Sequence, residues 1–275
     1  MHEVKLNIRY TGGDADNHKL NLYDAGASIH GLAKALAIST NALLKNGEIR
    51  SRTSSIPHTK FYLHPPRKGS FIELVSVFFD DPAVQLIGSS VIGAAFWDML
   101  RFSWYGTSGK DPQPIERIPK KIIKENELFP SEMADALEKP LAQFQRPILN
   151  SSEMKIEVKR PRMGTIMTFD KDTLDHVSTI VDSGEKENIK GNVTKYNIIT
   201  GYGKFYDDEL KKTIPFNNSK DLSYKESNNL TWSMHNAGES WTGKILIDAK
   251  VTNDNTGNVR RYEITGVRKA NETNS

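Results

Sequence analysis

Apolar and polar residues alternate at the start of the chain, over residues 4–10. This period of two predicts a half-buried β-strand. Between residues 29 and 44 the apolar spacing changes to that of one helix face, which predicts an amphipathic helix. Residues 58–63 and 70–77 then predict two antiparallel strands, because the intervening PPRKG segment supplies turn-forming residues.

The longest apolar run is AVQLIGSSVIGAAFWDML, residues 83–100, which carries no charge before Asp98. It follows two aspartates and a proline, a typical helix start, and predicts one apolar helix over residues 82–105. The uncharged residues 83–97 would span roughly 22 Å as a helix, against about 30 Å for the hydrocarbon core of a bilayer. A longer span must accommodate Asp98 and Arg101, which can pair on one helix face or face a water-filled lumen.

The apolar run has two interpretations. Aromatic residues crowd its C-terminal end, as at a membrane interface, and small residues recur four positions apart, as in closely packed membrane helices. Tightly packed soluble helices also use glycine and serine, and a chain of this size must bury a core or an oligomer seam. A helix buried in a soluble oligomer and released on a signal combines both interpretations. The candidate membrane or pore residues are Leu86, Ile87, Gly88, Ser89, Val91, Ile92, Gly93, Phe96, Trp97 and Trp104.

The chain changes character after a charged stretch near position 185. Short strand patterns follow in series, and residues 244–251 show the cleanest alternation in the chain. With a helix expected at 220–236, these strands predict a small antiparallel barrel of the OB or SH3 type. We therefore expect an α+β protein. Its parts are an N-terminal region of β-hairpins and helices over residues 1–184, the barrel over 185–269 and a disordered tail over 270–275.

Several classes of chemistry are excluded or unsupported by the sequence. The absence of cysteine excludes disulfides, thiolate zinc sites and cysteine nucleophiles. No phosphate-binding loop, metalloprotease, hydrolase or dinucleotide motif occurs, so we expect no enzyme activity, no metal and no cofactor. The DADNH segment at 14–18 is interpreted as a polar loop rather than a cation site. The first residues lack the apolar region of a signal peptide, which predicts synthesis in the cytosol.

Nucleic-acid contact has positive support. The net charge of +3 permits an anionic partner without requiring one. In the C-terminal part, lysines such as Lys195 and several arginines are interleaved with aromatic residues, as single-strand binding needs. Those aromatic residues are Tyr196, Tyr202, Phe205, Tyr206, Trp241 and Tyr262. The alternative is an ordinary solvated β surface. The candidate nucleic-acid-binding residues are Lys155, Lys159, Arg160, Arg162, Lys204, Lys244, Trp241, Arg260, Arg261 and Arg268.

The N-terminal pattern YTGGDADNHKLNLYDAGASIHGLAKAL, followed by HPPRKGSF and the apolar run, resembles bacterial proteins encoded with anti-phage defence operons. Within that group it resembles the membrane effectors of the Hailong system, which are partnered with a nucleotidyltransferase. The resemblance implies an oligomeric effector with sequestered membrane helices. It also implies that single-stranded DNA made by the partner enzyme holds the effector inactive, and that loss of this ligand releases a pore.

Two functional hypotheses follow from the sequence and from what this resemblance implies. The first is a pore-type membrane effector of an anti-phage system, a homo-oligomer held inactive by single-stranded DNA. It would be cytoplasmic when inactive and would enter the inner membrane when active. The second is a soluble nucleic-acid-binding or scaffold protein, in which the apolar helix belongs to the core or to an oligomer interface.

Overall fold

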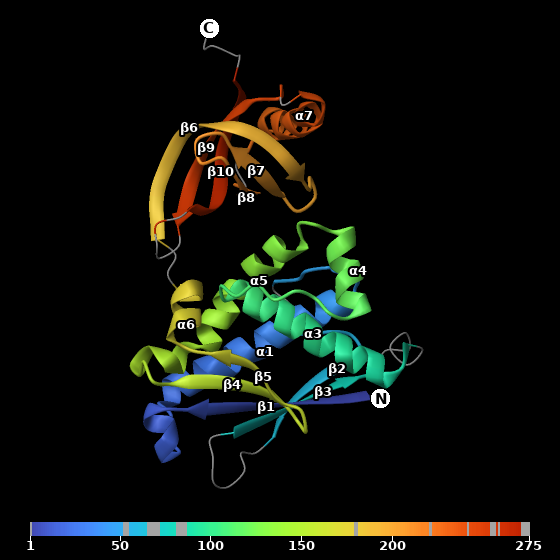
Figure 1. Cartoon of the computed structure of the whole chain (residues 1–275), viewed down its shortest axis with the longest axis vertical. Coiled ribbons are helices and arrows are strands. Elements are labelled where there is room, and N and C mark those ends of the chain that lie inside the picture. Colours follow the sequence, from blue (N-terminus) through green and yellow to red (C-terminus); the bar gives the residue numbers. More distant parts are fainter. Residues whose placement is uncertain are drawn as a thin grey trace. The chain divides into compact units, whose positions relative to one another are not determined.

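The computed structural model describes residues 2–51, 55–64, 72–80, 87–178, 181–219, 222–240, 242–253, 257 and 259–270. Within them the chain forms two compact units, which divide after Ser178. Unit 1 contains a five-stranded sheet and several helices, and unit 2 contains a closed five-stranded barrel and a helix (Figure 1). The α+β class and the barrel at the C-terminal end are thus confirmed. The division falls slightly before the boundary expected at residue 184.

The sheet of unit 1 is antiparallel, with the order β2-β3-β1-β4-β5. Its central strand β1 (His2–Thr11) is the one predicted from alternation, and its side chains at positions 4, 6, 8 and 10 are buried. The other strands are β2 (Thr59–His64), β3 (Ile72–Phe79), β4 (Lys155–Arg160) and β5 (Gly164–Phe169). Strands β2 and β3 are the predicted antiparallel pair.

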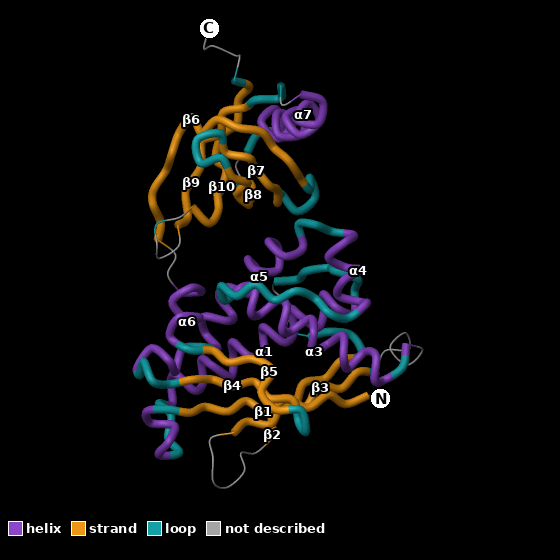
Figure 2. The backbone as a smooth tube through the Cα atoms, in the orientation of Figure 1, coloured by secondary structure: helices purple, strands orange, loops and turns teal. Residues whose placement is uncertain are grey.

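Helices cover one face of this sheet (Figures 1 and 2). Helix α1 (Leu22–Leu44) begins after Asn21, whose side-chain oxygen accepts hydrogen bonds from the first backbone N–H groups of the helix. Helices α3 (Ser89–Thr107) and α5 (Phe129–Phe144) pack against α1. The shorter helices of unit 1 are η1 (Gly13–Asn17), α4 (Arg117–Glu125), η2 (Arg146–Asn150) and α6 (Lys171–Ser178).

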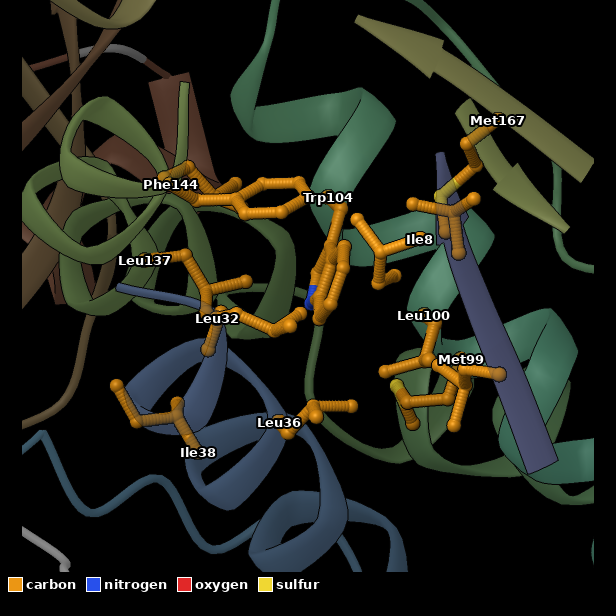
Figure 3. Packing of buried hydrophobic residues seen from close by; sticks show 14 of the residues in the cluster. Ile8, Leu32, Leu36, Ile38, Met99, Leu100, Trp104, Leu137, Phe144 and Met167 are labelled. Atoms are coloured by element: carbon orange, nitrogen blue, oxygen red, sulfur yellow. The ribbon is translucent and has the colours of Figure 1, made fainter. Parts of the chain in front are cut away.

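Trp104 of α3 lies in the centre of the core of unit 1. Figure 3 shows its ring between Leu36 of α1 and Phe144 of α5. The ring centroids of Trp104 and Phe144 are 5.8 Å apart, and the indole N–H donates a hydrogen bond of 2.9 Å to Ser39 Oγ. The Trp104 side chain is fully buried, and its one polar group is hydrogen-bonded. Burial of its large apolar surface is therefore favourable.

Helices α1 and α5 approach each other backbone to backbone at Gly31. A Cβ atom at this position would lie only 2.4 Å from both the Phe144 nitrogen and the Pro140 oxygen. One turn earlier, the Ser28 hydroxyl donates a hydrogen bond of 2.6 Å to the Phe144 carbonyl oxygen. The helix pair therefore depends on the absence of a side chain at Gly31. The atoms that a side chain would meet belong to the backbone of α5, which cannot move aside as a flexible side chain could.

Unit 2 forms its barrel in the order β10-β8-β7-β6-β9, and β6 closes it by pairing with both β7 and β9. Strands β8 and β10 are parallel, and α7 joins β8 to β9 in the chain. This topology is that of an OB-fold, one of the two barrel types expected. The elements are β6 (Val181–Tyr196), β7 (Tyr202–Asp207), β8 (Lys212–Asn218), α7 (Tyr224–Ser240), β9 (Ile245–Asn253) and β10 (Val259–Lys269).

A buried polar pair fixes the end of β7 inside the barrel. The Tyr262 hydroxyl donates a hydrogen bond of 2.6 Å to Asp207, whose other carboxylate oxygen accepts from the N–H groups of Glu209 and Leu210. Burial, together with the neighbouring Asp207 carboxylate, raises the pKa of Tyr262, so its hydroxyl stays protonated and can donate. These bonds hold the turn between β7 and β8 and thereby set the position of β7.

Two glycines of α1 provide a matched test of this packing. Gly31→Ala should lower the free energy of unfolding by about 1–3 kcal/mol, because the added methyl group meets backbone atoms. Gly26→Ala, with no atom within 4 Å of the new Cβ, should leave stability unchanged or raise it by up to about 1 kcal/mol. Thermal unfolding followed by circular dichroism measures both, and equal shifts for the two variants would contradict this packing.

Candidate nucleic-acid interface

Strand β7 presents two tyrosines and a lysine on its outer surface. Phe205 is fully buried in the barrel, and a Cβ atom on Gly203 would meet the buried ring of Phe216. Because side chains alternate along a strand, Tyr202, Lys204 and Tyr206 point outward. All three are partly exposed. The order aromatic, cation, aromatic therefore lies in one line on the surface.

A row of basic residues crosses β7 at its middle. On one side, Lys195 of β6 lies directly opposite Lys204. On the other side, Pro215 of β8 lies opposite Lys204, and the parallel pairing of β8 with β10 brings Arg261 beside Pro215 on the outer surface. We call Lys195, Lys204 and Arg261 the basic row, and together with Tyr202 and Tyr206 they form what we call the barrel face.

The two lysines of the basic row influence each other. Burial, and then the positive charge of Lys204, lowers the pKa of Lys195 from its ordinary value. Like charges directly opposite on neighbouring strands are unfavourable. An anion bound between Lys195 and Lys204 would remove this repulsion, so the row is arranged to gain more from a phosphate than two separate lysines would.

The loop between β6 and β7 adds apolar side chains beside the barrel face. Its backbone is held by Asn197, whose side-chain oxygen accepts hydrogen bonds from the N–H groups of Ile199 and Thr200. Ile198 and Ile199 are 72% and 91% exposed. In OB-folds, the surface of the second and third strands and the loop between the first two strands bind oligonucleotides and oligosaccharides. The barrel face and this loop occupy those positions.

Two of the remaining basic candidates in unit 2 are paired with carboxylates. The Lys244 ammonium is 2.6 Å from a carboxylate oxygen of Asp208, and the Arg268 guanidinium is 2.7 Å from one of Asp248. Arg260 is partly exposed near the start of β10. Trp241 lies outside the described residues. Among the aromatic candidates, Tyr196, Phe205 and Tyr262 pack into the barrel core.

The other four basic candidates belong to unit 1, on β4 and the turn that follows it. Lys155 is exposed, and Lys159 forms an ion pair of 2.9 Å with Glu157. Arg160 and Arg162 line a cavity near the start of α3. The ten predicted residues therefore do not form one surface within either unit. The sequence pattern included the tyrosines and lysines of the barrel face together with residues that point into the barrel. The alternation of side chains along β6 and β7 distinguishes the outward residues from the inward ones.

The predicted pore segment corresponds largely to α3, which begins at Ser89. Ile92, Phe96, Trp97 and Trp104 are buried in the core of unit 1 within a single copy of the chain. Gly93 is also buried, against His2. Ser89 is exposed in the first turn, Gly88 caps the helix, Ile87 and Val91 are 45% and 46% exposed, and Leu86 lies outside the described residues.

Asp98 joins α3 to the segment that leads into α4. Its carboxylate accepts hydrogen bonds of 2.7 Å from the backbone N–H groups of Ile115 and Glu116, and it forms an ion pair of 3.0 Å with Arg101. Arg101 donates further to the Gln113 carbonyl oxygen. Both charges of the apolar run are therefore satisfied by protein groups, and the buried carboxylate does not disfavour burial of the helix.

Among the residues that the structure describes, no helix has the length and apolarity needed to cross a bilayer. The same residues contain no group of three histidine, aspartate or glutamate side chains placed to hold a metal ion. In the DADNH segment, Asp16 accepts a hydrogen bond from the Gly12 N–H, as expected of a polar loop.

Comparison with known protein families divides the chain as the structure does. Residues 6–178 match a domain of unknown function, DUF7946, and residues 185–268 match a family of unknown function, DUF7947. The chain belongs to the DUF7946 family, whose match covers nearly all of unit 1. No curated protein and no solved structure matches the chain.

The coupling of the two lysines can be measured directly. In Lys204→Ala, the pKa of Lys195 should rise toward its ordinary value without reaching it, because burial is the larger cause of its lowering. Lys204→Arg keeps the charge and should leave the pKa of Lys195 lowered. Titration of isotopically labelled lysine side chains by NMR gives these pKa values. An unchanged pKa of Lys195 in Lys204→Ala would contradict the proximity of the two lysines.

Proposed function

We propose that unit 2 binds single-stranded nucleic acid on the barrel face. The observation that carries this proposal is the line Tyr202, Lys204, Tyr206 on the outer surface of β7, crossed by the basic row. Lys195, Lys204 and Arg261 supply positive charge across the strands, and a phosphate backbone running along the row would meet them in turn.

Base recognition in this proposal comes from stacking and apolar contact. Tyr202 and Tyr206 lie two residues to either side of Lys204, so bases attached to the bound phosphates can stack on their rings. Ile198 and Ile199 extend the apolar surface beside them. Stacking tolerates any base, so we expect weak sequence preference and strong dependence on salt.

The test uses the whole chain and a fluorescent oligothymidine of about 15 nucleotides. Tyr206→Ala should weaken binding roughly 5- to 150-fold, the loss expected when about 1–3 kcal/mol of stacking is removed. Lys204→Ala should reduce the slope of log affinity against log salt concentration by about 0.7, because one phosphate contact is lost. Fluorescence anisotropy measures both quantities.

Matched controls come from the first turn of α7. Tyr224 is 84% exposed and Lys225 is exposed, and neither belongs to the barrel face. Tyr224→Ala should therefore bind as the unchanged chain does, and Lys225→Ala should keep its salt slope. If these controls weaken binding as much as the face variants, or if the unchanged chain does not bind, the proposal is wrong.

A second proposal, the pore-type membrane effector, rests on the resemblance to Hailong effectors and on the uncharged residues 83–97. It includes a homo-oligomer, a partner nucleotidyltransferase and entry into the inner membrane on activation, all of which stay predictions. In the packed state, four of the candidate pore residues of α3 are buried in the core of unit 1, namely Ile92, Phe96, Trp97 and Trp104. Pore formation therefore requires α3 to leave that core.

A disulfide between α1 and α3 tests this requirement, since the chain has no cysteine of its own. The Oγ atoms of Ser39 and Ser103 are 3.5 Å apart, so cysteines at both positions can approach bonding distance. If the second proposal holds, the reduced double variant releases dye from liposomes of inner-membrane lipids and the oxidised one does not. The single-cysteine variants control for each substitution. Equal release in both redox states, or none from the unchanged chain, would refute it.

A further inference from the structure

Unit 1 contains a cavity of about 420 Å³ at the N-terminal end of α3. It is open to solvent and is lined by the start of β1, the first turns of α3 and the turn between β4 and β5. Among its lining residues are His2, Ser89, Trp97, Arg160 and Arg162. Its volume lies within the range of about 300–1,000 Å³ that is typical of small-molecule sites.

The cavity has an excess of positive charge. Within the described part of the chain, the guanidinium groups of Arg160 and Arg162 form no hydrogen bond or ion pair. Glu3 also borders the cavity, but its carboxylate accepts a hydrogen bond of 2.8 Å from Ser76 and lies 3.3 Å from the Lys5 ammonium. Both arginines are therefore available to an anionic ligand.

The first turn of α3 and His2 also border this space. Helix α3 begins after Gly88 with no side-chain cap, so its first N–H groups can bind an anion, and the helix dipole favours negative charge there. The His2 Nε2 atom is buried, and it has no hydrogen-bond partner among the described residues. A Cβ atom on Gly93 would lie 3.3 Å from this nitrogen, so glycine leaves room for the ring beside the helix.

The turn that carries Arg162 is conformationally unfavourable. Arg162 has a φ of 67°, in the left-handed region where a side chain costs about 1–2 kcal/mol and where glycine is preferred. Strain of this kind persists where the surrounding structure imposes it and is common at ligand sites. Here it holds a guanidinium group at the rim of a cavity that already contains an unpaired arginine.

We propose that this cavity binds a phosphate monoester. Arg160 and Arg162 contact the phosphate oxygens, and the first N–H groups of α3 donate to them. Trp97 forms part of the wall, where the organic part of the ligand packs. The proposed ligand is a free nucleoside monophosphate or the phosphorylated 5′ end of a nucleic acid strand. This site is separate from the barrel face and requires no binding there.

The experiment compares two short oligothymidines, one with a 5′-phosphate and one with a 5′-hydroxyl, and thymidine monophosphate, by calorimetry on the whole chain. The unchanged chain should prefer the phosphorylated oligomer by about tenfold or more. Arg160→Ala and Arg162→Gly should abolish this preference. Arg162→Gly relieves the unfavourable φ, so a lost preference in this variant reflects the guanidinium group and not misfolding.

Two controls make the outcomes distinguishable. Lys211 also has a positive φ, of 53°, but lies in unit 2, so Lys211→Gly should keep the preference. Tyr206→Ala should weaken binding of the 5′-hydroxyl oligomer and leave the phosphate-dependent binding in place, which separates failure of the barrel face from failure of the cavity. Binding of thymidine monophosphate identifies a free nucleotide as ligand, and binding of the phosphorylated oligomer alone identifies a strand end. Equal affinity for the two oligomers with no binding of the monophosphate would overturn the proposal.

Discussion

The packing of α3 into the core of unit 1 is the constraint on which most of this structure depends. Trp104 contacts residues of α5 and the sheet, and its hydrogen bond to Ser39 ties it to α1. Asp98, one and a half turns earlier, fixes the segment leading into α4. The same apolar surface cannot face this core and a bilayer at once, so insertion of α3 into a membrane would require that all of these contacts be given up together.

Unit 2 depends on a different constraint, which is closure of the barrel. Because β6 pairs with both β7 and β9, each strand has one inner and one outer surface, and the register decides which side chains reach solvent. The bond between Tyr262 and Asp207 holds one end of β7 from within the barrel. The line of Tyr202, Lys204 and Tyr206 on the outside is thus a consequence of the core residues between them.

The sequence predicted the parts of the fold that local patterns determine. Alternation identified β1 and β9, and the change of pattern near residue 185 separated the two units. Contacts between distant residues have no local pattern. The pairing of Lys244, a predicted binding residue, with Asp208 could not be read from the sequence. For the same reason, residues 83–97 left a core helix and a membrane segment as alternatives, because the partners that bury α3 lie on α1, α5 and the sheet.

The cavity in unit 1 connects ligand binding to the position of α3. Its walls include the first turn of α3, the start of β1 and the turn after β4, so a bound ligand contacts the helix and the sheet simultaneously. A ligand that binds only the packed state stabilises that state in proportion to the logarithm of its concentration over its dissociation constant. At a hundredfold excess this amounts to about 2.7 kcal/mol, comparable to the loss of a large buried side chain. A phosphate monoester at this site would therefore strengthen the docking of α3 without contacting Trp104 or Asp98.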